Sequence, residues 1–323
     1  MSESKAGITR RAFLGISAGI AAGGATFAQI ARGATSETKL LVGVRDVHLR
    51  MVGEQNSRSA MRAIGAQTVE IDLGPDMACQ AIFGSDEPLS IATEDGAKRL
   101  AESAEELRIF AYCMRNRFDE SPDEEVKQVV HVARMCKHTN TPVIRLDVVP
   151  RRIKDRDEFL KFAIETCKRL VKGTEETGVR LGIENHGNTT NDFTFTEKLF
   201  DGVGSERIGL TLDTGNFYWF GYPLSELYGI YEKFASRAFH THCKSIAYPK
   251  EQRNEKRKMG FEYGKYNCPV YEGDIDFKRV VAILRKANYT GDLCVENESL
   301  SKFPEAARRD VLAKEIAFLK ELA

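Results

Sequence analysis

The sequence lacks an excess of charge of either sign. Its 47 Lys and Arg residues are balanced by 47 Asp and Glu residues, so the formal net charge at pH 7 is zero. Proteins whose main partner is a nucleic acid or an anionic membrane surface usually carry a basic excess. The balance argues against both classes, and we expect no nucleic-acid partner.

Paired cysteines are also missing. The seven cysteines are widely spaced, and no two of them form a Cys-x-x-Cys motif. An odd number of scattered cysteines fits neither a disulfide framework nor a zinc knuckle. We expect most of them to be small buried residues of the core.

The sequence has no GxGxxG turn after its first apolar run, residues 40–45. A doubly wound open sheet that binds a dinucleotide would need such a turn there, because its backbone must approach the phosphates closely. The missing turn makes an open sheet less favourable than its main competitor, a closed barrel of parallel strands.

The N-terminal segment lacks the long Leu-, Ile- and Val-rich run of a membrane span. Thr9-Arg10-Arg11-Ala12-Phe13-Leu14 precedes a soft segment rich in Ala and Gly at residues 15–30, which is typical of a twin-arginine export signal. We expect residues 1–34 to be this signal. The mature protein would be periplasmic or extracellular, without stable membrane insertion. A membrane-anchoring helix is the alternative, and the short length and many glycines disfavour it.

Strand-like and helix-like segments alternate along residues 39–323. Such alternation indicates parallel strands joined by helices, and the length suits one barrel of about 250 residues. We therefore predict the α/β class, with a single (β/α)₈ TIM barrel over residues 39–323. The expected strands are 40–45, 68–73, 107–114, 142–149, 179–187, 208–212, 238–243 and 292–295. The expected helices are 55–64, 94–106, 123–137, 157–177, 194–203, 223–234, 277–287 and 301–322, with a long loop over the mouth at 246–272.

Polar groups follow the apolar part of four expected strands. They are Glu184, Asp213, His242 and Glu296. Because the strands of a parallel barrel all point one way, these side chains should converge on one rim. Three carboxylates and an imidazole suit a single divalent ion, with Mn²⁺ favoured and Mg²⁺, Co²⁺ or Zn²⁺ as alternatives. A lone glutamate at a strand end is usually a solvated residue or an ion-pair partner, so the prediction depends on all four together.

The same residues stand in motifs that resemble the xylose isomerase-like barrel superfamily. The matching branch is the sugar phosphate isomerase/epimerase family, which includes the tagatose/psicose 3-epimerases. The motifs are Gly182-Ile183-Glu184-Asn185-His186, Leu212-Asp213-Thr214-Gly215-Asn216, His240-Thr241-His242-Cys243-Lys244 and Val295-Glu296, with weaker matches at Thr68-Val69-Glu70-Ile71 and at residues 272–277. The resemblance covers about residues 40–323 and is specific for fold and metal rather than for substrate.

The resemblance implies a catalytic role for two of the four metal ligands. Glu184 and Glu296 would act as the acid/base pair of a metal-dependent isomerase or epimerase. Such an enzyme removes a proton next to the carbonyl of a sugar or keto-sugar through a metal-stabilised enediolate. Ser245 and Asn216 depart from the pattern of the ketose 3-epimerases. The alternative is a metal-dependent lyase or dehydratase that acts on keto-sugars or 3-keto-glycosides, and a third reading is a sugar-binding barrel without turnover.

Substrate contacts are expected from further polar and aromatic residues near the same rim. They are His186, Arg145, Lys244, His240, Asn216 and Trp219. Trp219 would form a wall against a sugar face, and Lys244 would hold a substrate oxygen. His240 could instead support its neighbours from behind, and salt bridges or core packing are the ordinary alternatives for the rest. The expected partner is a small-molecule carbohydrate, and homo-oligomer formation stays open.

Overall fold

The structure is a computed structural model that describes residues 39–85, 87–103, 108–116 and 118–323. The segment expected to be an export signal, residues 1–34, lies outside the described residues. Within the described ranges, no helix is both long enough and apolar enough to cross a membrane. The fold below is that of the unit from Leu40 to Ala323.

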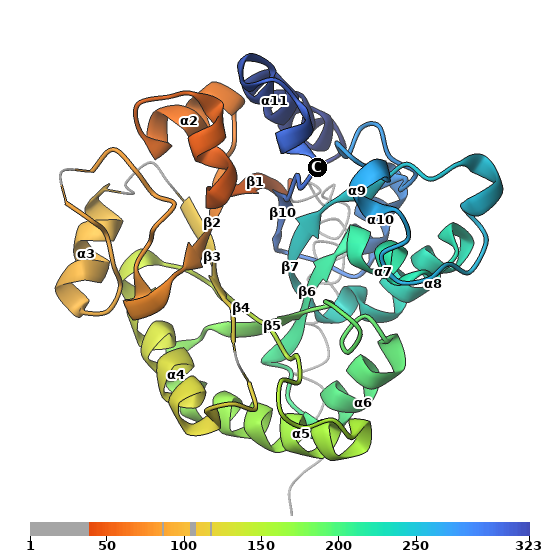
Figure 1. Ribbon diagram of the computed structural model, residues 1–323. Coiled ribbons are helices and arrows are strands. Elements are labelled where there is room, and N and C mark those ends of the chain that lie inside the picture. Colours follow the sequence, from red (N-terminus) through yellow and green to blue (C-terminus); the bar gives the residue numbers. More distant parts are fainter. Residues whose placement is uncertain (1–38, 86, 104–107, 117) are drawn as a thin grey trace, which may run out of the picture. The chain divides into compact units, whose positions relative to one another are not determined.

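Eight parallel strands close into a barrel in the order β1-β10-β7-β6-β5-β4-β3-β2 (Figure 1). The strands are short and buried on both faces, as expected where helices cover a parallel sheet. They are β1 (Leu41–Arg45), β2 (Thr68–Leu73), β3 (Arg108–Met114), β4 (Val143–Leu146), β5 (Arg180–Glu184), β6 (Ile208–Asp213), β7 (Ala238–Cys243) and β10 (Asp292–Val295). This closed ring confirms the predicted (β/α)₈ barrel and excludes the open sheet.

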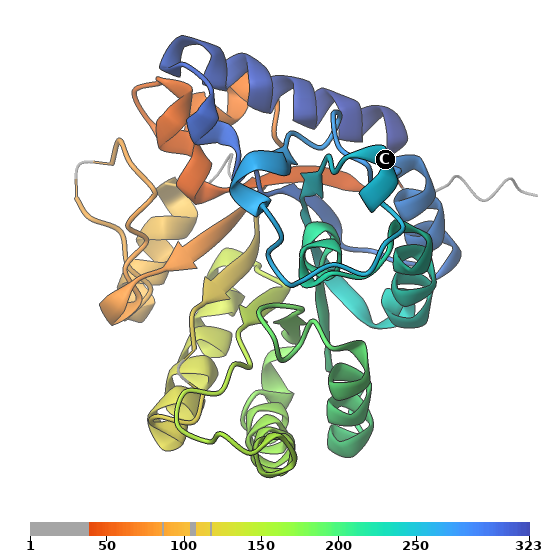
Figure 2. The same ribbon diagram turned by 45° about the vertical axis from the view of Figure 1, so that its right-hand side comes forward.

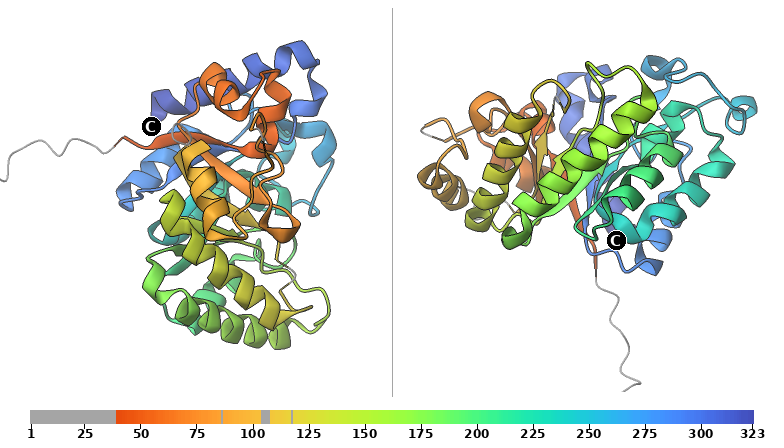
Figure 3. Two further views of the ribbon diagram at one scale, coloured as in Figure 1. Left: turned by 90° about the vertical axis from the view of Figure 1, so that its left-hand side faces the viewer. Right: turned by 90° about the horizontal axis from the view of Figure 1, so that it is seen from below.

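Helices join successive strands and surround the barrel (Figures 1 and 3). They are α2 (Ser57–Ile64), α3 (Glu94–Ser103), α4 (Pro122–Thr139), α5 (Arg156–Gly173), α6 (Phe193–Val203), α8 (Leu224–Phe234), α10 (Phe277–Lys286) and α11 (Glu305–Leu322). Aspartate side chains cap α5, α6 and α10 by accepting a backbone N–H of the first turn, which satisfies a donor that the helix leaves free. The long helix α11 runs beside α2 (Figure 2).

Several elements differ from the sequence prediction. A short helix, α7 (Thr214–Phe220), follows β6 directly, and Asp213 caps it by accepting from Gly215 N and Asn216 N at 2.8 Å each. The expected loop 246–272 contains an antiparallel pair, β8 (Ser245–Ile246) and β9 (Asn267–Cys268), and a helical turn, α9 (Tyr263–Tyr266). The 3₁₀ segments are η1 (Asp46–Val52), η2 (Pro75–Met77), η3 (Glu175–Thr177), η4 (Ala235–Arg237), η5 (Lys250–Gln252) and η6 (Leu300–Lys302). The closing helix begins later than predicted, after Pro304.

Register shifts in two strand pairs place extra residues inside the sheet. One shift lies between Val69 and Glu70 opposite β3, and the other between Leu210 and Thr211 opposite β7. The residues skipped on the partner strands are Phe110 and Phe239, which belong to a small apolar cluster separate from the main core. Such irregularities re-aim neighbouring side chains, and here they lie beside the residues that form the site.

The cysteines are free thiols, as expected. Cys268 is half-buried and the other six are buried. Burial raises the pKa of Cys79 to about 12 and that of Cys268 to about 12, because a thiolate is poorly solvated there. These two thiols therefore stay protonated at neutral pH.

Candidate metal centre

Four side chains from four strands converge at the C-terminal rim of the barrel. Glu184 ends β5, Asp213 ends β6, His242 lies near the end of β7, and Glu296 follows β10. One oxygen or nitrogen of each lies within 4.8 Å of those of the other three, and all four residues are buried. The structure thus brings together the complete set that the strand ends predicted.

The His242 ring presents one nitrogen to the carboxylates. Its Nε2 lies 2.8 Å from Glu70 Oε2, while Nδ1 lies 2.8 Å from Glu184 Oε1, 3.5 Å from Glu296 Oε2 and 4.0 Å from Asp213 Oδ2. A proton on Nε2 that is donated to Glu70 leaves the Nδ1 lone pair directed at the three carboxylates. This is the arrangement that a metal-binding histidine adopts when a carboxylate holds its other nitrogen.

Asp213 also fits a cation. Its Oδ1 caps α7. Its buried Oδ2 accepts no hydrogen bond from the described residues, and its contact with Lys244 Nζ, 2.9 Å away, is an ion pair. Burial raises the pKa of Asp213 to about 6, and the charge of Lys244 opposes that rise. The donor set of three carboxylates and one imidazole suits Mn²⁺, Mg²⁺ or Zn²⁺. The residues therefore fit one divalent ion, and the donor set alone does not select among these metals.

Basic side chains surround the carboxylates. Arg145 is ion-paired with Glu184, Arg45 Nη1 lies 2.5 Å from Glu296 Oε1, and Lys244 Nζ lies 2.9 Å from Glu296 Oε2. Burial alone would raise the pKa of Glu296, but the charges of Lys244 and Arg45 oppose it and hold that pKa well below its usual value. Glu296 is consequently a carboxylate at neutral pH.

A buried chain of hydrogen bonds supports the site from behind. His240 Nδ1 lies 2.6 Å from Asp292 Oδ1, and His240 Nε2 lies 2.9 Å from Glu70 Oε2. Burial tends to lower the pKa of His240, yet Asp292 and Glu70 raise it above its usual value. His240 has no exposed surface and does not line the mouth cavity. Its position matches the supporting role left open from the sequence rather than a substrate contact.

Sequence reasoning gave no role to Glu70. It accepts from both histidines and from Arg45 Nε at 2.7 Å. The available signal was a carboxylate in the middle of an apolar strand, since glutamate is rarely buried unless paired.

A cavity of about 360 Å³ opens beside the four side chains. We call it the mouth cavity. Five of the six predicted substrate residues line it, namely Arg145, His186, Asn216, Trp219 and Lys244. Asp147 and Tyr263 on α9 line it as well. Asp147 Oδ1 lies 3.1 Å from His186 Nδ1, and Tyr263 is hydrogen-bonded to Glu298. Burial would raise the pKa of Asp147, but Arg145 and His186 lower it to about 2.

Fold and site together define the class: a TIM barrel with a candidate metal centre among the C-terminal strand ends, where barrel active sites lie. Residues 59–322 match the family described as xylose isomerase-like TIM barrel. The chain therefore belongs to this family, which confirms that part of the resemblance. The match lies within the barrel and does not include residues 1–34, the segment expected to be the export signal.

Curated relatives with detectable similarity are inosose dehydratases. The enzyme of Clostridium perfringens strain 13 is 29% identical over 147 residues, which are 44% of this chain and 48% of the relative. That of Clostridium tetani is 30% identical over 149 residues, which are 42% of this chain and 49% of the relative. The chain spans about half the length of the curated relatives it matches.

Solved structures share the fold at low identity. A protein named IOLI with a zinc atom has a TM-score of 0.65 at 15% identity, covering 87% of this chain and 98% of its own. A xylose isomerase-like barrel from Mycobacterium smegmatis in complex with magnesium has a TM-score of 0.62 at 13% identity, covering 88% and 96%. Mannonate dehydratase from Streptococcus suis has a TM-score of 0.60 at 14% identity, covering 82% and 89%. At such identity these likenesses bear on the fold alone.

Proposed function

We propose that the protein is a divalent-metal-dependent enzyme that removes a proton from the carbon next to the carbonyl of a keto-sugar or a related polyol ketone. The convergence of Glu184, Asp213, His242 and Glu296 beside the mouth cavity carries the proposal. Glu184 and Glu296 line that cavity. A bound divalent ion would polarise the carbonyl and acidify the neighbouring C–H bond. We propose Mn²⁺ as this ion, with Mg²⁺, Co²⁺ or Zn²⁺ as the alternatives that the same hard-oxygen ligands would accept.

Glu296 is the base in this proposal. It lines the mouth cavity, and the charges of Lys244 and Arg45 keep it ionised. Lys244 and Arg45 also fix its two oxygens, so the carboxylate is oriented before substrate arrives. A base that is already ionised and positioned removes a proton without reorganisation.

We propose that the reaction continues as a β-elimination, so that the enzyme is a lyase. The pair of His186 and Asp147 supports this outcome, because Asp147 accepts from Nδ1–H and would stabilise the protonated ring, whose Nε2–H can pass a proton to a departing oxygen. The curated relatives named inosose dehydratase support it as well. Water or an alcohol would be the leaving group.

An isomerase or epimerase is the second candidate. Two glutamates line the mouth cavity from different strands, Glu184 from β5 and Glu296 beyond β10. If they face opposite sides of a bound sugar, one removes the proton and the other returns it. The same first step serves both candidates, and only the fate of the substrate distinguishes them.

The experiment incubates the Mn²⁺-loaded protein in D₂O with a panel of keto-sugars and inososes and follows products by NMR. Loss of a substituent supports the lyase, whereas a new C–D bond without such loss supports the second candidate. Glu296→Gln should lower the rate by about 10²–10⁴-fold, the usual contribution of a general base. Glu165→Gln, an exposed change on α5, is the matched control. Full activity after chelation would refute the role of the metal.

We further propose that residues 1–34 direct export through the twin-arginine pathway, because the Arg-Arg pair and the soft apolar segment have that pattern. Fractionation of cells that express the full chain should place the protein outside the cytoplasm. Replacing both Arg10 and Arg11 by Lys should retain it inside, and export that is unaffected would contradict the proposal.

A further inference from the structure

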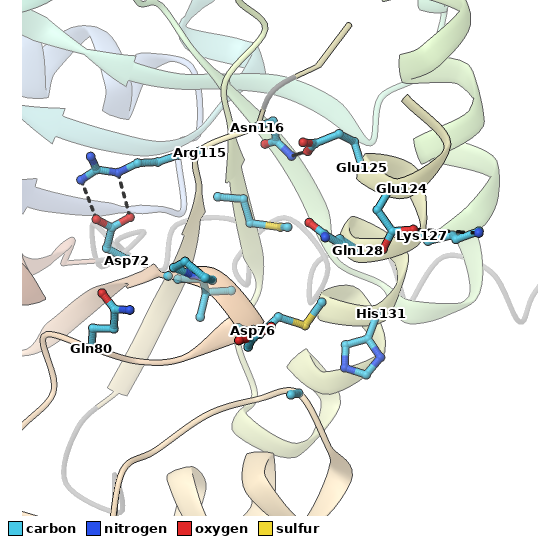
Figure 4. Close-up of a pocket in the computed structure, with 16 residues that line it drawn as sticks. Asp72, Asp76, Gln80, Arg115, Asn116, Glu124, Glu125, Lys127, Gln128 and His131 are labelled. Atoms are coloured by element: carbon cyan, nitrogen blue, oxygen red, sulfur yellow. Dashed lines mark hydrogen bonds and ion pairs between the residues drawn. The ribbon is translucent and has the colours of Figure 1, made fainter. Parts of the chain in front are cut away.

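A second, larger cavity lies beside the mouth cavity. Its volume is about 1020 Å³, and we call it the annex. It is bounded by the ends of β2 and β3 and by the first half of α4 (Figure 4). Arg115 lines both cavities and is ion-paired with Asp72 at 2.6 Å (Figure 4). This ion pair stands where the two spaces meet.

The two volumes suit different parts of a ligand. Pockets for small molecules usually measure about 300–1,000 Å³. The mouth cavity, at about 360 Å³, is near the lower end and the annex, at about 1020 Å³, is near the upper end. A single sugar ring at the metal centre would therefore leave the annex unused.

The charge of the annex limits what it can hold. Four carboxylates and two basic side chains line it: Asp72, Asp76, Glu124, Glu125, Arg115 and Lys127. Arg115 already pairs with Asp72, and Lys127 lies 3.9 Å from Glu124. A phosphate or a uronate would meet an excess of negative charge. The charge of the annex therefore disfavours an anionic ligand group.

A buried amide in the annex has an acceptor without a partner. Asn116 is only 4% exposed, and its Nδ2 donates to Glu125 Oε2 at 2.7 Å. Its Oδ1 accepts no hydrogen bond from the described residues. A buried acceptor normally has a partner. Because Asn116 lines the annex, rotation of its amide toward the cavity would let a ligand hydroxyl supply one.

One wall of the annex is apolar. Leu73, Met77 and Met114 contribute to it, and such side chains pack against the face of a sugar or an aromatic ring. Met77 has a φ of 55° and Asp76 a φ of 56°, a strained conformation for residues other than glycine. Ser90 Oγ holds this turn by donating to the carbonyls of Asp76 and Met77 at 3.0 and 3.1 Å.

We propose that the annex binds the second, uncharged unit of a glycoside whose oxidised sugar ring lies in the mouth cavity. The substrate class is then a keto-glycoside rather than a free keto-sugar. This inference rests on the proposed function and deepens it. Glu296 takes the proton from the carbon between the carbonyl carbon and the glycosidic carbon. The electron pair forms a C=C bond, the bond to the aglycone oxygen breaks, and the aglycone leaves as an alcohol after it gains a proton.

The test measures binding of unreactive glycosides, so it needs no turnover. The probes are the methyl and p-nitrophenyl glycosides of glucose, galactose, mannose and xylose, in both anomers, titrated calorimetrically into the Mn²⁺-loaded protein. At least one p-nitrophenyl glycoside should bind about tenfold more tightly than its methyl counterpart, the factor that corresponds to about 1.4 kcal/mol. The ring would enter the annex, whereas a methyl group leaves it empty.

Two tryptophan variants on α4 localise the effect. Gln128→Trp fills the annex, because Gln128 lines it, and should abolish the tenfold preference while methyl glycosides bind as before. Arg134→Trp, at an exposed position on the same helix, should retain the preference. Equal affinity for both members of every pair, or a preference that survives Gln128→Trp, would overturn the annex proposal.

Failure of the proposed function gives a different result. If the protein never exchanges a substrate proton with D₂O, the aryl preference and its loss in Gln128→Trp would still be observed. If free keto-sugars turn over but no aryl preference exists, the annex proposal fails and the metal-dependent chemistry stands.

Discussion

At the scale of the residue, the geometry of the metal centre depends on the contacts that the buried Glu70 makes. One oxygen faces both histidines and the other faces Arg45. It thereby sets which nitrogen of His242 carries the proton, and it compensates the charge of Arg45 next to Glu296. Glu70, which is not one of the four proposed ligands, thus orients the nitrogen with which His242 can act as a ligand.

Glu70→Gln should weaken Mn²⁺ binding by about 10–100-fold, as is usual when a carboxylate behind a metal-binding histidine is lost. Whichever way the amide turns, its NH₂ group faces either the histidines or Arg45, which are donors. Calorimetric titration measures the affinity, and thermal unfolding of the metal-free proteins checks that the variant folds. Glu232→Gln, exposed on α8, is the matched control. Unchanged affinity in Glu70→Gln would show that other contacts orient His242.

At the scale of the element, strand glycines allow neighbouring strands to approach each other. A Cβ at Gly43 in β1 would lie 2.0 Å from Thr68 Oγ1 and 2.7 Å from the Thr68 carbonyl oxygen. Thr68 in turn donates to Asp292 Oδ2 at 2.6 Å, which positions the carboxylate beside His240. Gly229 in α8 is the opposite case, because a Cβ there would have no atom within 4 Å.

These two glycines should respond in opposite directions to alanine. Gly43→Ala should lower the free energy of unfolding by about 1–3 kcal/mol, since overpacking displaces the β2 backbone. Gly229→Ala should raise it by about 0.5–1 kcal/mol, because glycine is a poor residue in a helix interior. Urea unfolding of both variants beside the parent protein measures the changes. A stabilised Gly43→Ala variant would mean that β1 and β2 are not packed as described.

At the scale of the whole molecule, two buried acids make stability depend on pH. Burial raises the pKa of Glu315 from 4.5 to about 7, and burial raises that of Asp46 from 3.8 to about 7. Glu315 on α11 accepts from Val270 N at 2.8 Å and from Asn297 Nδ2 at 2.7 Å. It thereby ties the last helix to the segments that follow β9 and β10. In the folded protein both acids keep a proton that the unfolded chain releases at lower pH.

These two acids should therefore make the free energy of unfolding fall as pH rises from about 4.5 to about 7, since in this window they bind more protons in the folded state than in the unfolded chain. His48, whose pKa burial lowers from 6.5 to about 4, acts in the opposite direction over part of this window, so the contribution of Glu315 is read from the difference between the parent protein and a Glu315→Gln variant. For Glu315 the change should be on the order of 1–3 kcal/mol. Urea unfolding in the presence of a chelator, at intervals between pH 4.5 and 8, measures it. Glu315→Gln removes one titrating group, so its stability relative to the parent protein should improve across the window. A constant difference between the two proteins would contradict this account of Glu315.

The sequence by itself determined the barrel and the rim. Alternating segments specify parallel strands, and polar residues at strand ends must converge because all strands of a parallel barrel point the same way. Glu184, Asp213, His242 and Glu296 could be named for this reason. The same geometry predicts that Arg145, His186 and Lys244 lie at the mouth of the barrel.

Only the tertiary structure decided how these side chains are partnered. The burial of His240, the double acceptor role of Glu70 and the helix capped by Asp213 depend on strands distant in the chain and on register shifts between β2 and β3 and between β6 and β7. The annex likewise forms between the ends of β2 and β3 and α4, where no single segment carries its pattern. Periodicity reports which face a residue takes within its own element. It does not report which group from another element lies opposite, because that depends on how the closed barrel packs.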